Sequence, residues 1–434
     1  MLGIPNNIVM IYQTYLYVCA VILKFFTMNV NLKCKGIIAV SLIVVIMVAC
    51  QKLMPPALNS NDDISNGVVP GLTPEQLALH ASGDNEFSQI FTPAEGLGPI
   101  FDQPSCNSCH VSNGKGNPST VITRFAKVTG SIVDSLYNEG GPQLRPNAIP
   151  GFLGGTLPPD ANVFSHRMPP IVMGQGLIQA LADSSILANA YPHDGVSGVP
   201  NYVNPTPFFI PQPGQIPVNG QYLARFGKKA VRVSLQDMVV FALITEIGAT
   251  SDYDQNKGYN YLTGVNSGYT VQDPNVSAGF VNNLVFYLRT LKVPPRRNTS
   301  DPDVIAGEQL FNQIQCVTCH VSTFVTPQSD ISALSNQTFH PFSDFLLHDM
   351  GPALDDGYPE GSAKSFQWRT APLWGVGLAG NSQGGQLFLL HDGRATSFPQ
   401  AISFHGGEAA GRSSAFFSLS QQQQNQIVKF LQSL

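Results

Sequence analysis

Two stretches decide the fold of this chain: Cys106-Asn107-Ser108-Cys109-His110 and Cys316-Val317-Thr318-Cys319-His320. Each places two thiols three positions apart and a histidine directly after the second thiol. Thiols at this spacing can reach both vinyl groups of one haem, while the adjacent imidazole reaches the iron from the same side. The sequence therefore predicts two covalently bound c-type haems, attached through Cys106, Cys109, Cys316 and Cys319 and ligated by His110 and His320.

The spacing argues against other uses of these cysteines. Zinc sites usually pair two Cys-x-x-Cys groups within roughly 20 residues, and these two lie about ten times further apart. A thioredoxin-like disulfide site needs a nearby βαβ pattern, which the flanking sequence does not show. Cys19, Cys34 and Cys50 lie in or at the end of an apolar N-terminal region, so no pair remains for a structural disulfide.

Composition indicates a loop-rich globular protein. The chain has 434 residues, of which 12% are charged, with 40 Gly and 33 Pro. This length is enough for two or three domains, each with its own core. The formal charge of −5 and the lack of a basic run argue against nucleic acid as a partner.

The N-terminal region is typical of an export signal. From Met28 onward, Lys33 and Lys35 precede an apolar run over 36–48 that ends at Ala49-Cys50. This run suits a signal peptide better than a membrane span, which needs about 20 residues. It predicts lipidation of Cys50, with an uncleaved anchor helix as the alternative. Residues 1–27 are expected to be an upstream extension, or else to form a membrane hairpin with the second apolar run.

Export is consistent with the haem prediction, because haem is attached to c-type cytochromes outside the cytoplasm. We therefore expect a lipoprotein of the cell envelope, on the periplasmic side. Gln51 follows Cys50 in place of the Asp that often retains lipoproteins at the inner membrane, which favours the outer membrane.

The predicted architecture is mainly α: two cytochrome-c-like haem domains with long Pro/Gly-rich loops. We expect a signal and extension over 1–49, a tether over 50–71, an N-terminal haem domain over 72–292 and a C-terminal cytochrome c domain over 301–434. The two haem domains would be joined near 293–303. Helical spacing of apolar residues predicts helices over 234–247, 276–291 and 305–311. A last helix should begin at a capping box made by Ser420 and Gln423.

A weak internal repeat supports two homologous halves. Arg167-Met168-Pro169-Pro170 followed by Gly174-Gln175-Gly176-Leu177 resembles Arg369-Thr370-Ala371-Pro372 followed by Gly375-Val376-Gly377-Leu378. Each copy follows its haem motif at a similar distance.

From about residue 72 to the end, the chain resembles the di-haem oxidoreductase family, also called thiol-oxidoreductase-like. This family is distantly related to bacterial di-haem cytochrome c peroxidases. The resemblance rests on six segments that occur in order: Gly96-Leu97-Gly98-Pro99-Ile100-Phe101, Arg225-Phe226-Gly227, Leu347-His348-Asp349-Met350-Gly351, Arg369-Thr370-Ala371-Pro372-Leu373-Trp374-Gly375, Leu390-His391-Asp392-Gly393-Arg394-Ala395 and His405-Gly406-Gly407-Glu408-Ala409.

The resemblance implies a distal ligand for the second haem. In the peroxidase relatives, an iron ligand of the C-terminal haem lies 14 residues after the His of a His-Asp-Gly motif, which here leads from His391 to His405. His405 is therefore the predicted partner of His320, and Met350 and His348 are its rivals.

The first haem has no such ligand by the same reasoning. Ala242 is the counterpart of His405 in the repeat, and Ile247 stands where many family members carry a Met. The remaining candidates are His166, Met168, Met238 and Glu246, or no protein ligand at all. An open iron position could bind peroxide. Glu246 could then act as an acid/base and Arg167 as a nearby cation, although each is equally an ordinary structural residue.

Other residues have weaker expectations. Arg369 and Arg394 are candidates to pair with haem propionates, because Arg binds carboxylates in a bidentate manner. Trp374 lies between the haems as an electron relay or is a packed core residue. His80, His193 and His340 are expected to be structural or exposed.

The leading functional prediction is an exported, lipid-anchored di-haem oxidoreductase of the peroxidase-like type, with electron transfer between its haems. The alternative is a non-catalytic electron carrier in which both irons are six-coordinate. Either function needs a redox partner protein, which the sequence does not name. Calcium, found between the haems of the peroxidase relatives, has no ligand pattern in this sequence.

Overall fold

The computed structural model describes residues 67–191, 194–256 and 271–434. The predicted signal segment, Cys50, most of the predicted tether and His193 lie outside these residues. Within the described ranges, no helix combines the length and apolar composition needed to cross a membrane.

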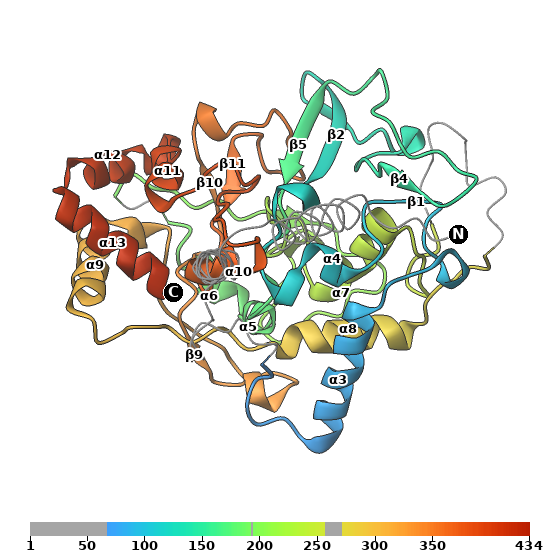
Figure 1. Cartoon of the computed structure of the whole chain (residues 1–434), viewed down its shortest axis with the longest axis horizontal. Coiled ribbons are helices and arrows are strands. Elements are labelled where there is room, and N and C mark those ends of the chain that lie inside the picture. The colour runs from blue at the N-terminus through green and yellow to red at the C-terminus, as the bar shows by residue number, and fades with distance from the viewer. Residues whose placement is uncertain (1–66, 192–193, 257–270) are drawn as a thin grey trace, which may run out of the picture. The chain divides into compact units, whose positions relative to one another are not determined.

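Short helices alternate with long loops and very short strands (Figure 1). The α-helices are α3 (Pro74–Ser88), α4 (Cys106–Cys109), α5 (Gln175–Ala180), α6 (Asp183–Leu187), α7 (Leu235–Ala242), α8 (Ala278–Thr290), α9 (Pro302–Gln313), α10 (Ala379–Ser382), α11 (Phe398–Ser403), α12 (Ala410–Ser418) and α13 (Gln421–Ser433). The strands are β1 (Ile100–Phe101), β2 (Ile122–Thr129), β3 (Ile132–Asp134), β4 (Asn147–Ala148), β5 (Val163–Arg167), β6 (Tyr202–Val203), β7 (Tyr222–Leu223), β8 (Phe324–Val325), β9 (Thr338–Phe339), β10 (Leu347–Asp349) and β11 (Gln367–Arg369).

The prediction of a mainly α fold is wrong. Of the described residues, 36% lie in helices and 14% in strands or bridges, so the fold is mixed. The strands form small antiparallel sheets: β1 with β4, β3 with β2 and β5, β6 with β7, β8 with β9, and β10 with β11. Pairings such as β2 with β5 join distant segments through tertiary contacts, so local sequence periodicity gave little sign of them.

The four predicted helices are present. α7 begins at the Ser234 cap, and a single π-helical turn, Leu243–Ile247, extends it. α8 fills the second predicted range, while α9 begins earlier than expected, at Pro302 behind the Asp301 cap. The capping box of α13 forms as predicted between Ser420 and Gln423.

Two helix pairs make the most extensive contacts between elements of the fold. α3 lies against α8, and α9 lies against α13 (Figure 1). The larger core cluster includes Phe87, Leu284 and Tyr287 from the first pair, and the smaller includes Phe311 and Phe430 from the second. The segment predicted as a linker, 293–303, runs between α8 and α9.

The internal repeat extends to the way each half packs. In each pair a glycine lies against the partner backbone: a Cβ on Gly83 would lie 2.2 Å from the Asn283 carbonyl oxygen, and one on Gly307 would lie 2.0 Å from that of Gln426. Arg167 ends β5 and Arg369 ends β11, each shortly before its half's Gly-x-Gly turn. The two halves therefore repeat a helix pair as well as a short motif.

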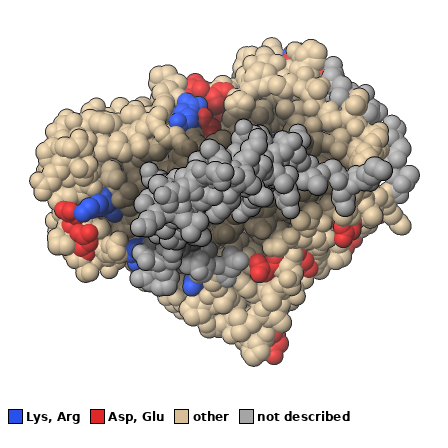
Figure 2. All heavy atoms as spheres, viewed as in Figure 1, with Lys and Arg blue, Asp and Glu red and all other residues tan. Residues whose placement is uncertain are grey.

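Charged side chains are sparse on the face shown in Figure 2, where the described atoms form no large patch of one sign. Basic residues gather instead inside the protein, around the cavity described next.

Candidate haem-binding site

A cavity of about 480 Å³ lies between the two Cys-x-x-Cys-His motifs. Both motifs contribute to its wall, through Cys106, His110, Cys316, Cys319 and His320. Most other wall residues are apolar and come from segments spread between Phe87 and Leu431. Protein interiors are normally packed with few voids larger than a water molecule. A space of this size lined by two cysteine motifs fits a large, mostly apolar ligand.

The first motif forms α4. The Ser105 side chain caps this helix by accepting a hydrogen bond from the Ser108 amide, and the His110 amide donates to the Cys106 carbonyl at 3.0 Å. His110 Nδ1 donates to the Pro170 carbonyl at 2.8 Å. This bond places the proton on Nδ1 and leaves the Nε2 lone pair free. Burial lowers the pKa of His110 to about 4, so the ring is neutral and suited to bind a metal.

The second motif has the same arrangement on a different local structure. Cys316–Thr318 form a single 3-10 turn, and the His320 amide donates to the Cys316 carbonyl at 3.0 Å. His320 Nδ1 donates to the Phe342 carbonyl at 2.8 Å, which again leaves Nε2 free. Burial lowers the pKa of His320 to about 4.

The four motif cysteines are free thiols. Burial raises the pKa of Cys106 and Cys316 to about 12 and also raises that of Cys109. A raised pKa keeps Cys106, Cys109 and Cys316 as neutral thiols, which argues against a thiolate metal site at these residues.

His405 is the third histidine held in this way. It follows α11 and donates from Nδ1 to the Ala401 carbonyl at 2.9 Å. The ring lines the cavity, burial lowers its pKa, and it is close enough to His320 to lower the pKa of that ring as well. The structure thus brings together the predicted pair His320 and His405.

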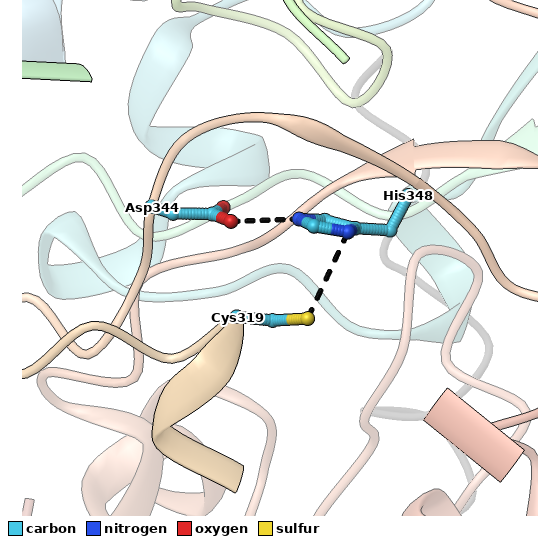
Figure 3. A group of neighbouring side chains, drawn as sticks. All are labelled: Cys319, Asp344 and His348. Atoms are coloured by element: carbon cyan, nitrogen blue, oxygen red, sulfur yellow. Dashed lines mark hydrogen bonds and ion pairs between the residues drawn. The ribbon is translucent and has the colours of Figure 1, made fainter. Parts of the chain in front are cut away.

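His348, a rival of His405, has both ring nitrogens engaged. Nε2 lies 2.7 Å from Asp344 Oδ2, and Nδ1 lies 2.9 Å from Glu408 Oε2 (Figure 3 shows the Asp344 bond). Burial alone would lower the pKa of His348, but its bonds to Asp344, Cys319 and Glu408 raise it to about 12. A protonated ring between two carboxylates has no lone pair for iron. Met350 also lines the cavity and remains a rival.

Cys319, Asp344 and His348 bring their ligand atoms within 4.8 Å of one another (Figure 3). Such a cluster could hold a metal ion if the sulfur were a thiolate and the imidazole neutral. The carboxylates keep His348 protonated, and the motif assigns Cys319 to haem. The arrangement therefore fits an ion-pair network beside the second motif better than a separate metal site.

The distal candidates of the first motif are scattered. His166 is exposed on β5, bonded to Thr123, and is not part of the cavity wall. Met168 lines the cavity, but its sulfur lies 3.4 Å from the Gln383 amide nitrogen. Met238 and Glu246 line the cavity from α7 and the π turn. Among the described wall residues, no histidine other than those of the motifs, His348, His391 and His405 is present.

Glu246 is placed by the π turn, a rare structure that occurs frequently at functional sites. Burial and the nearby Asp102 carboxylate raise the pKa of Glu246 to about 8, although Arg124 opposes this. Its charge also raises the pKa of Cys106 and Cys109, which places it beside the first motif. Glu246 is therefore a protonated acid inside the cavity at neutral pH.

Arg167 lines the same cavity but is already paired. Its Nη1 lies 2.6 Å from Glu360, whose other oxygen lies 3.0 Å from Arg124. The two guanidinium groups outweigh the effect of burial and lower the pKa of Glu360 to about 2. Arg124, rather than Arg167, is the cation whose charge acts on Glu246. Arg124 and Glu360 had no motif that could reveal them in the sequence.

Arg369 and Arg394, the predicted propionate partners, are placed differently. Arg369 lines the cavity and donates from Nε to the Gly227 carbonyl at 2.9 Å. Arg394 is outside the wall, where its side chain bonds Asp392 and the Ala353 carbonyl.

Trp374 is buried in the larger core cluster and also lines the cavity, so both of its predicted roles fit its position. His391 stacks on Trp368 with ring centroids 3.7 Å apart. Burial and neighbouring cations lower the pKa of His391 to about 2. Outside the cavity, His80 is buried against Thr290, and His340 is exposed.

The cavity wall is strongly basic. Among the described residues of the wall, one is acidic, Glu246. Seven are basic: Lys115, Arg124, Arg167, Lys228, Arg232, Arg369 and Arg412. Each haem carries two carboxylates, so two haems would bring counter-charges to this wall. The apolar space, the free Nε2 atoms and the basic lining together fit haem.

Comparison with known proteins is consistent with this fit. A family described as "Di-haem oxidoreductase, putative peroxidase" matches residues 157–434. No curated protein matches the chain. Among solved structures, a hydrazine synthase of Kuenenia stuttgartiensis pressurised with xenon is similar at 15% identity, over 88% of this chain and 93% of that one, with a TM-score of 0.39.

Proposed function

Because the chain belongs to the di-haem oxidoreductase family, we propose that it is a c-type di-haem enzyme that reduces a peroxide-like substrate at its first haem. The observation that carries this proposal is the difference between the two ends of the cavity. His110 and His320 each offer a free Nε2, but among the described histidines His405 and His348 lie close enough to act on the His320 ring, and none acts in this way on His110.

The residues that would hold the haems follow from this geometry. Cys106, Cys109, Cys316 and Cys319 would provide the thioether bonds, and His110 and His320 the proximal ligands. His405 would complete the second iron. When bound, the haems supply one-electron chemistry at iron.

The part of the cavity near His110 has the groups that peroxide reduction requires. That reaction consumes two electrons and two protons and yields two waters. Glu246 is positioned to donate a proton, because burial keeps it protonated at neutral pH. Arg124, fixed on Glu360, supplies positive charge beside it, and Arg167, paired with the other oxygen of Glu360, lines the same cavity. Trp374 and the shared wall provide a route for electrons from the second haem.

The alternative, a non-catalytic electron carrier, requires a protein ligand on the first iron as well. Met168 and Met238 are wall methionines that could serve, and Met168 could do so only if its Sδ left the hydrogen bond from the Gln383 side-chain amide. Among the described residues, no histidine acts on His110 as His405 acts on His320, and this difference favours the enzyme.

Electron paramagnetic resonance and optical spectra of the haem-loaded protein, with and without hydrogen peroxide, test this choice. The enzyme should show a high-spin iron that reacts with peroxide beside a low-spin His/His iron. Two low-spin irons that do not react with peroxide in either the oxidised or the half-reduced state would overturn the proposal in favour of a non-catalytic electron carrier.

We further propose that the protein is an outer-membrane lipoprotein on the periplasmic side, anchored through Cys50. The support is the sequence of residues 28–51 and the need to attach haem outside the cytoplasm. Mass spectrometry of the N-terminal peptide should find lipid on Cys50. The C50A variant should leave the membrane fraction, and a variant that stays there unlipidated would contradict the anchor.

A further inference from the structure

Lys228 is a basic residue of the cavity wall, and in the described part of the chain Asp392 is the carboxylate whose charge acts on it. The side chain lines the wall, directly after the turn at Gly227. Among the described residues, neither a carboxylate within ion-pair distance nor a hydrogen-bond acceptor faces its Nζ. An enclosed ammonium without a counter-charge is costly unless something else pairs with it.

The next residue, Lys229, has hydrogen bonds and an ion pair within the protein. Its Nζ donates to the carbonyls of Ser365 at 2.6 Å and Gln367 at 3.1 Å, and lies 3.3 Å from Asp356. It also lies 3.9 Å from the centroid of Trp368. Lys229 thus has a structural role, whereas Lys228 lines the cavity.

Two further cations without a carboxylate partner lie close to Lys228. Lys115 Nζ donates to the carbonyls of Phe388 at 2.8 Å and Leu390 at 3.0 Å. Arg369 is tied to the Lys228 segment, since its amide donates to the Lys228 carbonyl at 2.9 Å. Burial, followed by the charges of Lys115, Arg369 and Arg167, lowers the pKa of Lys228 well below its ordinary value, although the Asp392 carboxylate opposes this shift. We call Lys115, Lys228 and Arg369 the cation cluster.

The cation cluster lies between the two motifs. Lys115 follows His110 by a few residues, and the charge of Lys228 acts on the His110 ring. On the other side, Arg369 is close enough to Asp344, beside Cys319, for that carboxylate to raise its pKa against the effect of burial. Three segments from different parts of the chain therefore point their positive charges at the space that both haems would share.

We propose that the cation cluster binds the propionate carboxylates of both haems and that Lys228 is a counter-ion common to the two. This inference rests on the proposed function, since it requires haem at both motifs. Ammonium and guanidinium groups are the natural partners of carboxylates in a water-poor space. A positive charge beside a haem disfavours the ferric form, which carries one more positive charge than the ferrous form, so Lys228 raises both reduction potentials.

Potentiometric titration of the haem-loaded protein tests this role. Replacing Lys228 with Met should shift both midpoint potentials to lower values and change the propionate bending modes in resonance Raman spectra. Replacing it with Arg should keep the charge and restore potentials close to those of the original protein. K127M, which removes a charge from an exposed ion pair with Asp160, is the matched control and should leave both potentials unchanged.

K228M removes no hydrogen bond within the described protein, so the variant should fold and bind haem. Unchanged potentials and propionate modes in a K228M protein with two haems would overturn the inference, and a shift of one potential alone would overturn the shared role. Haem counting on the original protein comes first: fewer than two covalent haems would refute the proposed function itself, a result distinct from either outcome with the variant.

Discussion

His405 is held by its own helix turn, through the bond from Nδ1 to the Ala401 carbonyl. Replacing His405 with Ala should turn the second haem from low-spin to high-spin, because the fixed imidazole opposite His320 is lost. The measurement is the electron paramagnetic resonance spectrum of the oxidised protein. H340A, which removes an exposed histidine bonded to Thr323, should leave the spectrum unchanged. A low-spin signal that survives in H405A would instead favour Met350 as the ligand.

Glu246 should determine how peroxide reduction depends on pH. Burial and Asp102 raise its pKa to about 8, so the carboxyl can donate a proton below that pH and loses this ability as the pH rises through it. The rate should therefore fall above about pH 8. E246Q should lower the rate at neutral pH by about 100-fold and abolish the alkaline fall. E75Q, on the exposed face of α3, is the control, and an unaltered pH profile in E246Q would exclude Glu246 as the donor.

Single residues were predictable where chemistry requires a fixed spacing. The motif cysteines and histidines were visible for that reason, and His405 came from a family resemblance. The structure brings all of them except Cys109 to the wall of one cavity. Lys228, Arg124 and Glu360 had no such signal, because their roles depend on neighbours far away in the chain. Arg167 and Glu360, for example, meet across 193 positions.

At the scale of elements, helices with a capping signal and an apolar face were predictable. The box at Ser420 and Gln423, with Ile427 and Phe430 buried on one face, is the clearest case. The π turn after α7 was not, because nothing local distinguishes Leu243–Ile247 from an ordinary last turn. Most strands were missed because two or three residues are too few for an alternating pattern to stand out.

The close contact between α9 and α13 depends on Gly307. A Cβ there would lie 2.0 Å from the Gln426 carbonyl oxygen and 2.9 Å from Phe430 Cβ. G307A should therefore lower the free energy of unfolding by about 1–3 kcal/mol, since the helices must move apart. Urea unfolding measures this change.

Gly411 is the matched control for that experiment. It lies inside α12 with nothing within 4 Å of the added Cβ. G411A should stabilise the protein by about 0.5–1 kcal/mol, because alanine favours the helix. Equal effects of the two substitutions would show that helix propensity, and not the α9–α13 contact, dominates at Gly307.

At the scale of the whole molecule, side chains between Phe87 and Leu431 line one cavity of about 480 Å³, and most of them are apolar. Bound haem would remove this apolar surface from water. A ligand that binds only the folded state stabilises it, so the protein without haem should be less stable than the haem-loaded protein.

The variant C316A/C319A tests that conclusion together with the haem count. It should carry one covalent haem instead of two, seen as a lower mass and a smaller pyridine haemochrome signal per protein. Its midpoint of thermal unfolding should fall, because the half of the cavity near His320 loses its covalently attached haem. C19A/C34A should keep both haems and the original midpoint. Two haems in C316A/C319A would refute attachment at the second motif.

The wall of the cavity is built from segments between Phe87 and Leu431, so the cavity can form only when nearly the whole chain is present. If haem is attached as proposed, the enzymes that attach it must act on a chain that is still open. A cell short of haem would then leave such chains unable to close and exposed to proteases. The abundance of this protein should accordingly follow haem supply more closely than transcription of its gene.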